Sequence, residues 1–420
     1  MDFNLIRSKV NMWSVGLLVI FVLHVFLRFY HIEERLLFGW DQVRDAWVMR
    51  GILHEGILPV LGPVAKYSAF KIGAAYYYLL LPFYFIFSLN PIAGGVFAGV
   101  VSVLTSLVLF VVTRRVFNIR VALISMFIHA VSINIYNLDR LAWNAGLISS
   151  VSLVIYYSLY NISKGDLRYI PILALVAGFA FHVHFTALFF VIIATLFFVT
   201  IPMSKKLLKY LLLSFPLFLM WFLPHFISDL TASSHQSQSV FNYIGNSYHG
   251  LHLKRVLQLA TDAFIQFEIV LPFQAVRFLK YFLFLAFIGL VLLKKSNNAR
   301  HLVFLTTLWF VVPWFVFSVY SGEISAYYFL LTRPIVIMIL GALTVWLLEQ
   351  RYMVVKLGII SFWLVYAVVN MFVFFQIPIS DYLTDVNQTK NAIASGNEIE
   401  FSEGNAKSYL YYIHTYAAGK

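Results

Sequence analysis

The apolar residues of this chain lie in long unbroken runs, and these runs recur from residue 12 to residue 376. Segments such as 16–27 and 211–223 are apolar on every face. Strands of a membrane barrel would instead alternate apolar and polar positions over ~10 residues. Because a helical span needs ~20 predominantly apolar residues, the pattern predicts an all-α polytopic membrane protein.

Runs of about 17–25 apolar residues predict a bundle of about eleven to twelve transmembrane helices. The eleven clearest segments are 12–30, 95–113, 121–138, 145–161, 169–183, 185–201, 207–225, 276–293, 302–320, 326–348 and 354–375. The polar residues His182 and His184 supply the break between two of them. A twelfth apolar stretch, 74–89, needs the charges to decide its place.

The basic residues of the short loops set the orientation. If 74–89 does not cross, thirteen of them share the side of the N-terminus: Arg114, Arg115, Arg120, Lys164, Arg168, Lys205, Lys206, Lys209, Lys294, Lys295, Arg300, Arg351 and Lys356. The opposite short loops carry only Arg140. Cytoplasmic loops hold the excess of Lys and Arg, so we expect 74–89 to lie in the outer interface or to be re-entrant.

This orientation predicts one membrane domain, residues 1–376, with large loops 30–94 and 226–275 on the outer face. A short outer tail follows at 377–420 and is too small for a core of its own. We expect an amphipathic interfacial helix over 253–264. No repeat of 20–50 residues is visible in the chain, unlike in many secondary transporters.

Composition and charge agree with a membrane protein. The 420 residues are 61% hydrophobic and 11% charged, against about 25% charged in ordinary soluble domains. The net charge of +12 reports membrane orientation, and we expect no nucleic-acid partner. The chain contains no cysteine, which excludes disulfides, thiolate nucleophiles and Cys-ligated metals.

The densest group of ionisable residues follows the first span, where Asp41 precedes a helical pattern over 42–53. Asp41 has the position of an N-cap, and Arg44 lies one turn further on the same face. A capping carboxylate with a surface ion pair is one interpretation of this pair, and a catalytic carboxylate is the other.

A family resemblance favours the catalytic interpretation. The string Phe38-Gly39-Trp40-Asp41-Gln42-Val43-Arg44-Asp45-Ala46 resembles the first loop of GT-C membrane glycosyltransferases, in particular the dolichyl-phosphate-mannose protein mannosyltransferase-like family, which includes bacterial aminoarabinose transferases. Further similar segments are 56–63, 73–79, 114–118, 140–144 and 327–334. Where the family often has Asp-Glu, this chain has Asp41-Gln42, so a second carboxylate is absent at that position.

The resemblance implies a sugar donor on a polyprenyl phosphate, with Asp41 as the catalytic base. One carboxylate suffices for an inverting displacement, whereas a retaining mechanism needs a second one. Arg44 and Lys71 are the candidate phosphate ligands, with Lys66 as the fallback. Lysines that snorkel at the interface are the alternative for Lys71 and Lys66.

Further candidates lie on later outer turns. Arg140, Trp143 and Asn144 are candidates for holding the sugar, although Asn144 is equally suited to cap a helix. Tyr327 belongs to the matching late segment. Arg333 lies about 10 Å into a span and requires a polar cavity or a carboxylate, for which Glu323 is one candidate.

The histidines at 182 and 184 allow three interpretations: a turn with satisfied imidazoles, a metal site, or His184 lining the acceptor side of a cavity. The chemistry calls for no cofactor, and a divalent metal is left open.

The sequence therefore predicts an enzyme of the plasma membrane that transfers a sugar from a polyprenyl-phosphate donor to an acceptor hydroxyl on the outer face. A flippase or transporter for a lipid-linked glycan, or a glycan polymerase or ligase, is the alternative. The partners are the lipid-linked donor, membrane lipid and an acceptor that is a protein, a lipid or a polysaccharide.

Overall fold

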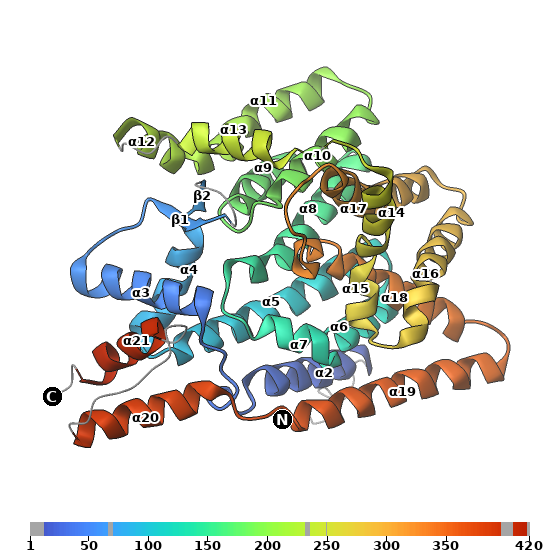
Figure 1. The fold of residues 1–420 in the computed structure, drawn as a ribbon. Coiled ribbons are helices and arrows are strands. Elements are labelled where there is room, and N and C mark those ends of the chain that lie inside the picture. The colour runs from blue at the N-terminus through green and yellow to red at the C-terminus, as the bar shows by residue number, and fades with distance from the viewer. Residues whose placement is uncertain (1–11, 66–69, 232–235, 249, 396–405, 418–420) are drawn as a thin grey trace, which may run out of the picture.

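A computed structural model describes residues 12–65, 70–231, 236–248, 250–395 and 406–417. The described part is almost entirely helical (Figure 1). Its one sheet is an antiparallel pair, β1 (Leu61–Val64) and β2 (Lys71–Gly73), in which Leu61 faces Gly73.

Every predicted apolar segment is helical. Within the described residues, seven helical segments are long and apolar enough to cross a membrane: Met12–Phe29 (α2), Ile92–Val116 (α5), Asn144–Ser163, Lys205–Thr231, Gln274–Leu292 (α16), Asn297–Ser318 (α17) and Met353–Phe375 (α19). The third comprises η1 (Asn144–Leu147) and α8 (Ile148–Ser163), and the fourth comprises α11 (Lys205–Leu219), η2 (Met220–Phe222) and α12 (Leu223–Thr231). The pair α6 (Ile119–Val131) and α7 (Ile133–Asp139), bent by 68°, is an eighth if it counts as one span. The prediction of an all-α polytopic membrane protein is confirmed.

Four apolar helices are shorter: α4 (Ala75–Ile86), α9 (Tyr169–Ala180), α10 (Ala187–Val199) and α18 (Arg333–Leu348). The sequence count of eleven spans includes the last three. A turn over residues 181–186 separates α9 from α10, as the two histidines predict. Helix α4, which is the uncertain stretch 74–89, has 12 residues and extends ~18 Å at 1.5 Å per residue, short of the ~30 Å hydrocarbon core.

Helix α3 (Trp40–Glu55) covers the amphipathic segment predicted after the first span. The prediction that Asp41 is its N-cap is wrong. Gly39 is the N-cap, with extended backbone, and its N–H donates to the Gln42 side-chain oxygen at 3.4 Å. Asp41 stands in the first turn, where the helix dipole favours a negative charge, so its side chain is free of a capping duty.

The C-terminal tail forms two helices, α20 (Asp381–Ser395) and α21 (Ala406–Ala417). It has no core of its own, because its buried residues Tyr382, Val386, Tyr411 and Tyr412 join one cluster with α3, α4 and the start of α5. The Tyr411 hydroxyl donates to the Leu89 carbonyl at 2.7 Å. The tail is therefore packed onto the first loop.

The second large loop is also helical. It contains α13 (Gln236–Ser247), α14 (Leu253–Asp262) and α15 (Ile265–Val270). Helix α14 confirms the predicted amphipathic segment, and the Trp314 indole fixes its position by donating to the Val256 carbonyl at 2.8 Å.

Figure 1 shows how these parts are arranged. Helices α2, α5 and α19 run roughly along the horizontal of the view, and α3, the β1–β2 hairpin, α20 and α21 gather on its left side. The turns that join α5 to α6, α16 to α17 and α18 to α19 lie at the right end. The first loop and the tail thus share one end of the bundle, and these three basic turns lie at the other.

Candidate functional site

A cavity of about 250 Å³ opens where α3 meets the hairpin and the ends of later helices. Segments from five parts of the chain line it: the first turns of α3, the hairpin, the turn before α8, the loop between α9 and α10, and η3 (Ala326–Phe329). Six of the predicted site residues line this cavity, namely Asp41, Arg44, Trp143, Asn144, His184 and Tyr327.

Two carboxylates hold the Arg44 side chain at the cavity wall. Its Nη1 donates to Asp41 at 2.5 Å, and its Nε donates to Asp45 at 2.8 Å. The Asp41 side chain is 46% exposed, whereas that of Asp45 is 1% exposed. Burial raises the pKa of Asp45 to about 7, against the lowering effect of Arg44. At neutral pH the buried carboxyl is therefore partly protonated, so it compensates the positive charge of Arg44 only in part.

His184 presents a neutral hydrogen-bond donor to the cavity. Burial lowers the pKa of the imidazole to about 3. The Thr186 backbone N–H, which can only donate, points at His184 Nδ1 at 3.3 Å, and the Thr186 hydroxyl lies 3.0 Å from the same nitrogen. Nδ1 is therefore the acceptor, and the ring proton belongs on Nε2. The structure agrees with the interpretation that His184 lines the cavity.

Aromatic rings form the wall opposite α3. The Trp143 and Tyr327 rings lie 5.0 Å apart, and Tyr327 also contacts the His184 ring at 5.9 Å. The Asn144 amide donates to the Val183 carbonyl at 2.6 Å. This bond ties the turn before α8 to the loop that carries His184, so that both face the same space.

The predicted lysines have a different setting. Lys71 is exposed on β2, while its neighbour Ile72 is buried and lines the cavity. Because side chains alternate across a strand, the Lys71 side chain points away from the face that carries Ile72. Lys66 lies outside the described residues.

Arg140 and Arg333 do not line the cavity. The Arg140 guanidinium donates to the Arg35 carbonyl at 3.3 Å. Arg333 is buried and pairs through Nη1 with Asp139 at 3.2 Å, while its Nε donates to the Gln266 amide oxygen at 3.1 Å. The carboxylate that pairs with Arg333 is thus Asp139, and not the Glu323 that the sequence offers.

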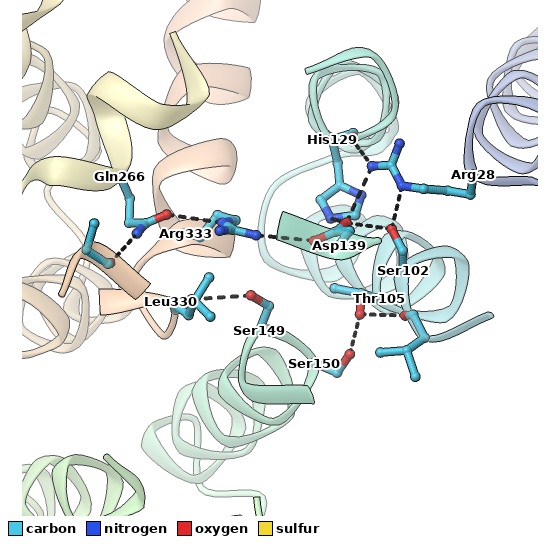
Figure 2. A network of polar contacts seen from close by, with 12 residues as sticks. Arg28, Ser102, Thr105, His129, Asp139, Ser149, Ser150, Gln266, Leu330 and Arg333 are labelled. Carbon is cyan, nitrogen blue, oxygen red and sulfur yellow. Dashed lines mark hydrogen bonds and ion pairs between the residues drawn. The ribbon is translucent and has the colours of Figure 1, made fainter. Parts of the chain in front are cut away.

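Figure 2 shows the buried network around Asp139. Arg28 from the first span approaches the same carboxylate at 3.4 Å and donates to Ser102 at 2.8 Å. Ser102 in turn donates to Asp139 at 2.5 Å, and His129 Nε2 lies 3.7 Å from it. Two arginines, a serine and a histidine therefore share one carboxylate, which leaves Asp139 occupied by structural partners.

Sequence reasoning missed this network. The ionisable residues inside the predicted apolar spans were the sequence signal for it, because such residues are costly in a membrane and pair with one another. Arg28 and His129 lie in predicted spans, but only the tertiary structure shows that they meet at Asp139 (Figure 2).

His182 has a structural role. Its Nδ1 accepts from the Ala75 backbone N–H at 3.2 Å, and its Nε2 lies 2.5 Å from the Trp221 carbonyl. These contacts join the start of α4 to the segment around Trp221 through the loop that follows α9. Within the described ranges, no three His, Asp or Glu side chains come close enough together to hold a metal ion.

Comparison with known structures identifies the fold. The chain is similar to ArnT from Cupriavidus metallidurans in the apo state, with 13% identity and a TM-score of 0.59 over 94% of this chain and 68% of that one. The same enzyme bound to undecaprenyl phosphate matches with 14% identity and a TM-score of 0.57, over 96% and 76% of the two chains.

An archaeal enzyme has the same architecture. The Archaeoglobus fulgidus oligosaccharyltransferase in the apo form matches with 12% identity and a TM-score of 0.58. The match covers 96% of this chain but only 60% of that one, so this chain spans less than two thirds of its length. The class of protein is thereby defined: the chain has the GT-C fold of membrane glycosyltransferases.

The family comparison points the same way. The model of the dolichyl-phosphate-mannose-protein mannosyltransferase family matches residues 73–227, from the end of the hairpin to α12. No curated protein sequence matches the chain. The similarity to GT-C mannosyltransferases expected from the sequence is confirmed, over residues 73–227 by the family model and in the fold by the solved structures.

Proposed function

We propose that this protein is a glycosyltransferase that moves a sugar from a polyprenyl-phosphate donor to an acceptor hydroxyl on the outer face of the membrane. The observation that carries the proposal is the convergence of Asp41, Arg44, Asn144 and His184 on one cavity. A carboxylate, a guanidinium, an amide and a neutral imidazole suit a sugar phosphate, and two similar enzymes support a lipid carrier. ArnT was solved with undecaprenyl phosphate, and the archaeal oligosaccharyltransferase AglB with dolichol phosphate.

The proposed reaction inverts the anomeric carbon. Asp41 removes the proton from the acceptor hydroxyl while the acceptor oxygen forms the new bond to the anomeric carbon. The bond from that carbon to the phosphate oxygen breaks, and the electron pair leaves with the polyprenyl phosphate. Asp41 is the more exposed carboxylate of the Arg44 pair, so an acceptor can approach it from the cavity.

Arg44 is proposed to stabilise the leaving phosphate. A guanidinium has five N–H donors, and the hydrogen bonds of Arg44 to Asp41 and Asp45 leave other donors for a phosphate. Partial protonation of Asp45, whose pKa is about 7, lowers the negative charge that the phosphate meets. Lys71 stays a predicted ligand for the same phosphate, and a rearranged hairpin would be needed to bring it into the cavity.

His184 and the aromatic wall are proposed to hold the sugar. The Nε2 proton of a neutral imidazole donates to a hydroxyl or phosphate oxygen without adding a charge. The rings of Trp143 and Tyr327 give the apolar face of a sugar a surface on which to lie. The cavity is close to the lower limit of ~300 Å³ for ligand pockets, which suits one sugar and its phosphate.

The first prediction concerns Asp41→Asn in the purified protein. Asparagine has no basic carboxylate, so turnover of a polyprenyl-phosphate-linked sugar should fall at least about a hundredfold. Donor binding should be largely retained, because Arg44 remains. Folding should be preserved, since Gly39 and not Asp41 caps the helix.

The matched control is Asp166→Asn, which makes the same change at a carboxylate paired with Arg168 in the turn between α8 and α9. Its turnover should equal that of the parent. Turnover of Asp41→Asn within a few-fold of the parent would sink the assignment of the base, and Asp45 would be tested next.

A further inference from the structure

A second and larger cavity lies on the other side of Arg44. It measures about 930 Å³, is open on one side, and is lined by α3, the segment 57–59 and the C-terminal helix α21. Its wall is mostly apolar, with Trp40, Trp47, Ile57 and Leu410 among its side chains. We call it the α3–α21 cavity.

The two ends of the α3–α21 cavity carry opposite charges. Arg44 lines it near the start of α3, and Glu55 lines it at the end of the same helix. Eleven residues separate them, which is ~16 Å along the helix axis. Arg44 also lines the smaller cavity that contains Asp41. An anionic group is therefore favoured at the end that adjoins the proposed reaction site, and apolar surface follows from there.

Gly51 indicates that the space is kept open. It lies inside α3, where glycine costs about 1 kcal/mol relative to alanine. It lines the α3–α21 cavity, and a Cβ placed on it would meet nothing within 4 Å. Neither close helix packing nor an unusual backbone angle at this position calls for glycine. A side chain here would fill the cavity.

The tail builds the opposite wall. Trp47 is held against α21 by ring contacts at 5.4 Å with both Tyr411 and His414. Phe38 packs on Tyr411 and Tyr412. These contacts place Leu410 and Ser408 across from α3. The last described helix of the chain is thus part of the cavity, although it is remote in sequence from every residue around Asp41.

We propose that α21 and α3 together hold the isoprenoid chain of the donor, and that α21 thereby makes the enzyme selective for that chain. The inference rests on the proposed function. The isoprenoid chain of the donor is attached to its phosphate. Arg44, the proposed phosphate ligand, lines both cavities. An acceptor would instead be attached at Asp41, which lines only the smaller cavity. The isoprenoid chain that extends into the α3–α21 cavity is therefore that of the donor.

Two substitutions test the proposal, each of which places a large side chain into the cavity from one wall. Gly51→Phe does so from α3 and Leu410→Trp from α21. KM is measured for a long-chain polyprenyl-phosphate donor, for a donor with a chain of two isoprene units, and for the acceptor. Each variant should raise the long-chain KM at least tenfold and leave the other two within about threefold.

A control separates filling from unfolding. Gly289→Phe adds the same ring on α16, where a Cβ also meets nothing within 4 Å. It should keep the parent values. Equal effects on both donors, or a raised acceptor KM, would overturn the proposal. An effect from Gly51→Phe alone would refute the part assigned to α21.

A binding measurement keeps this proposal apart from the proposed function. Native mass spectrometry of the purified protein with sugar-free polyprenyl phosphate reports lipid occupancy without any transfer. Loss of occupancy in both filling variants supports the cavity even if the parent transfers no sugar. Unchanged occupancy in both variants contradicts the cavity even if the parent is an active transferase.

Discussion

At the scale of single residues, the protein places two aspartates of one helix in opposite environments. Asp41 is half-exposed and Asp45 is buried, although both bind the same arginine. This difference in exposure gives them different roles in the proposed mechanism. Asp41 is accessible to an acceptor, Asp45 compensates part of the charge of Arg44, and Arg44 lines both cavities. The pair of cavities meets at this single guanidinium.

Asp45 should make stability depend on pH. Its pKa is raised to about 7 by burial, against about 3.9 in an unfolded chain, so between these values the folded protein binds a proton that the unfolded chain releases. The free energy of unfolding should therefore fall as pH rises from 5 to 7, by on the order of 2 kcal/mol. Thermal unfolding in detergent across this range measures it.

The comparison for Asp45 is Asp45→Asn, which cannot titrate and should give a flatter pH profile. Asp166→Asn should keep the parent profile. A parent profile that does not change between pH 5 and 7, or an unchanged slope in Asp45→Asn, would show that the buried carboxyl is not the source.

At the scale of elements, the β1–β2 hairpin is the piece that closes the smaller cavity. Pro63, Val64 and Ile72 bring it to the cavity wall. The loop between α9 and α10 fixes the position of the hairpin. The Gly73 N–H donates to the Phe181 carbonyl at 3.3 Å, and His182 accepts from the N–H of Ala75, two residues after the hairpin. The loop between α9 and α10 thus positions both the hairpin and His184.

Gly73→Ala should disturb this arrangement. A Cβ on Gly73 would lie 2.1 Å from His182 Nδ1, so β2 or the imidazole must move. A shift of about 1 Å in a residue that shapes a reaction site can cost about a hundredfold in rate, and we expect kcat/KM to fall at least tenfold. Turnover of the purified variant checks this.

The matched control for the hairpin is Gly289→Ala, which adds a methyl group where nothing lies within 4 Å. Gly73→Ala combined with His182→Ala should recover part of the loss, because the smaller side chain leaves room for the methyl group. Parental activity in Gly73→Ala would mean that the hairpin does not need this close approach.

At the scale of the whole molecule, the first loop and the tail lie at one end of the bundle and three of the basic turns at the other (Figure 1). The positive-inside rule assigns the basic end to the cytoplasm. We therefore expect the proposed reaction site and the α3–α21 cavity to lie on the outer face.

The topology can be measured with single cysteines, because the chain has none. Lys390→Cys in α20 should react in intact cells with a membrane-impermeant thiol reagent. Lys294→Cys, after the end of α16, should react only once the membrane is opened. The reverse labelling pattern would invert the orientation and move the proposed chemistry to the cytoplasmic side.

The fold class followed from the sequence because apolar runs have one stable solution in a membrane. Backbone polar groups must be satisfied within each segment, so the runs form helices. All eleven predicted segments are helical, and the turn at 181–186 was marked by its histidines. Six predicted site residues meet at one cavity because they stand at the ends of neighbouring helices.

What only the tertiary structure decided depends on contacts between distant parts of the chain. Periodicity does not report that Arg28, Asp139 and Arg333 pair in one network, since they are far apart in sequence. The capping residue of α3 was misassigned because aspartate and glycine both suit that position, and the backbone angles select Gly39. The tail is too small for a core of its own, as the sequence predicts, and only the structure shows that the tyrosines of α20 and α21 share the core of the first loop. Sequence fixes which segments are helical through local burial, whereas the meeting of distant side chains is set by how those helices pack.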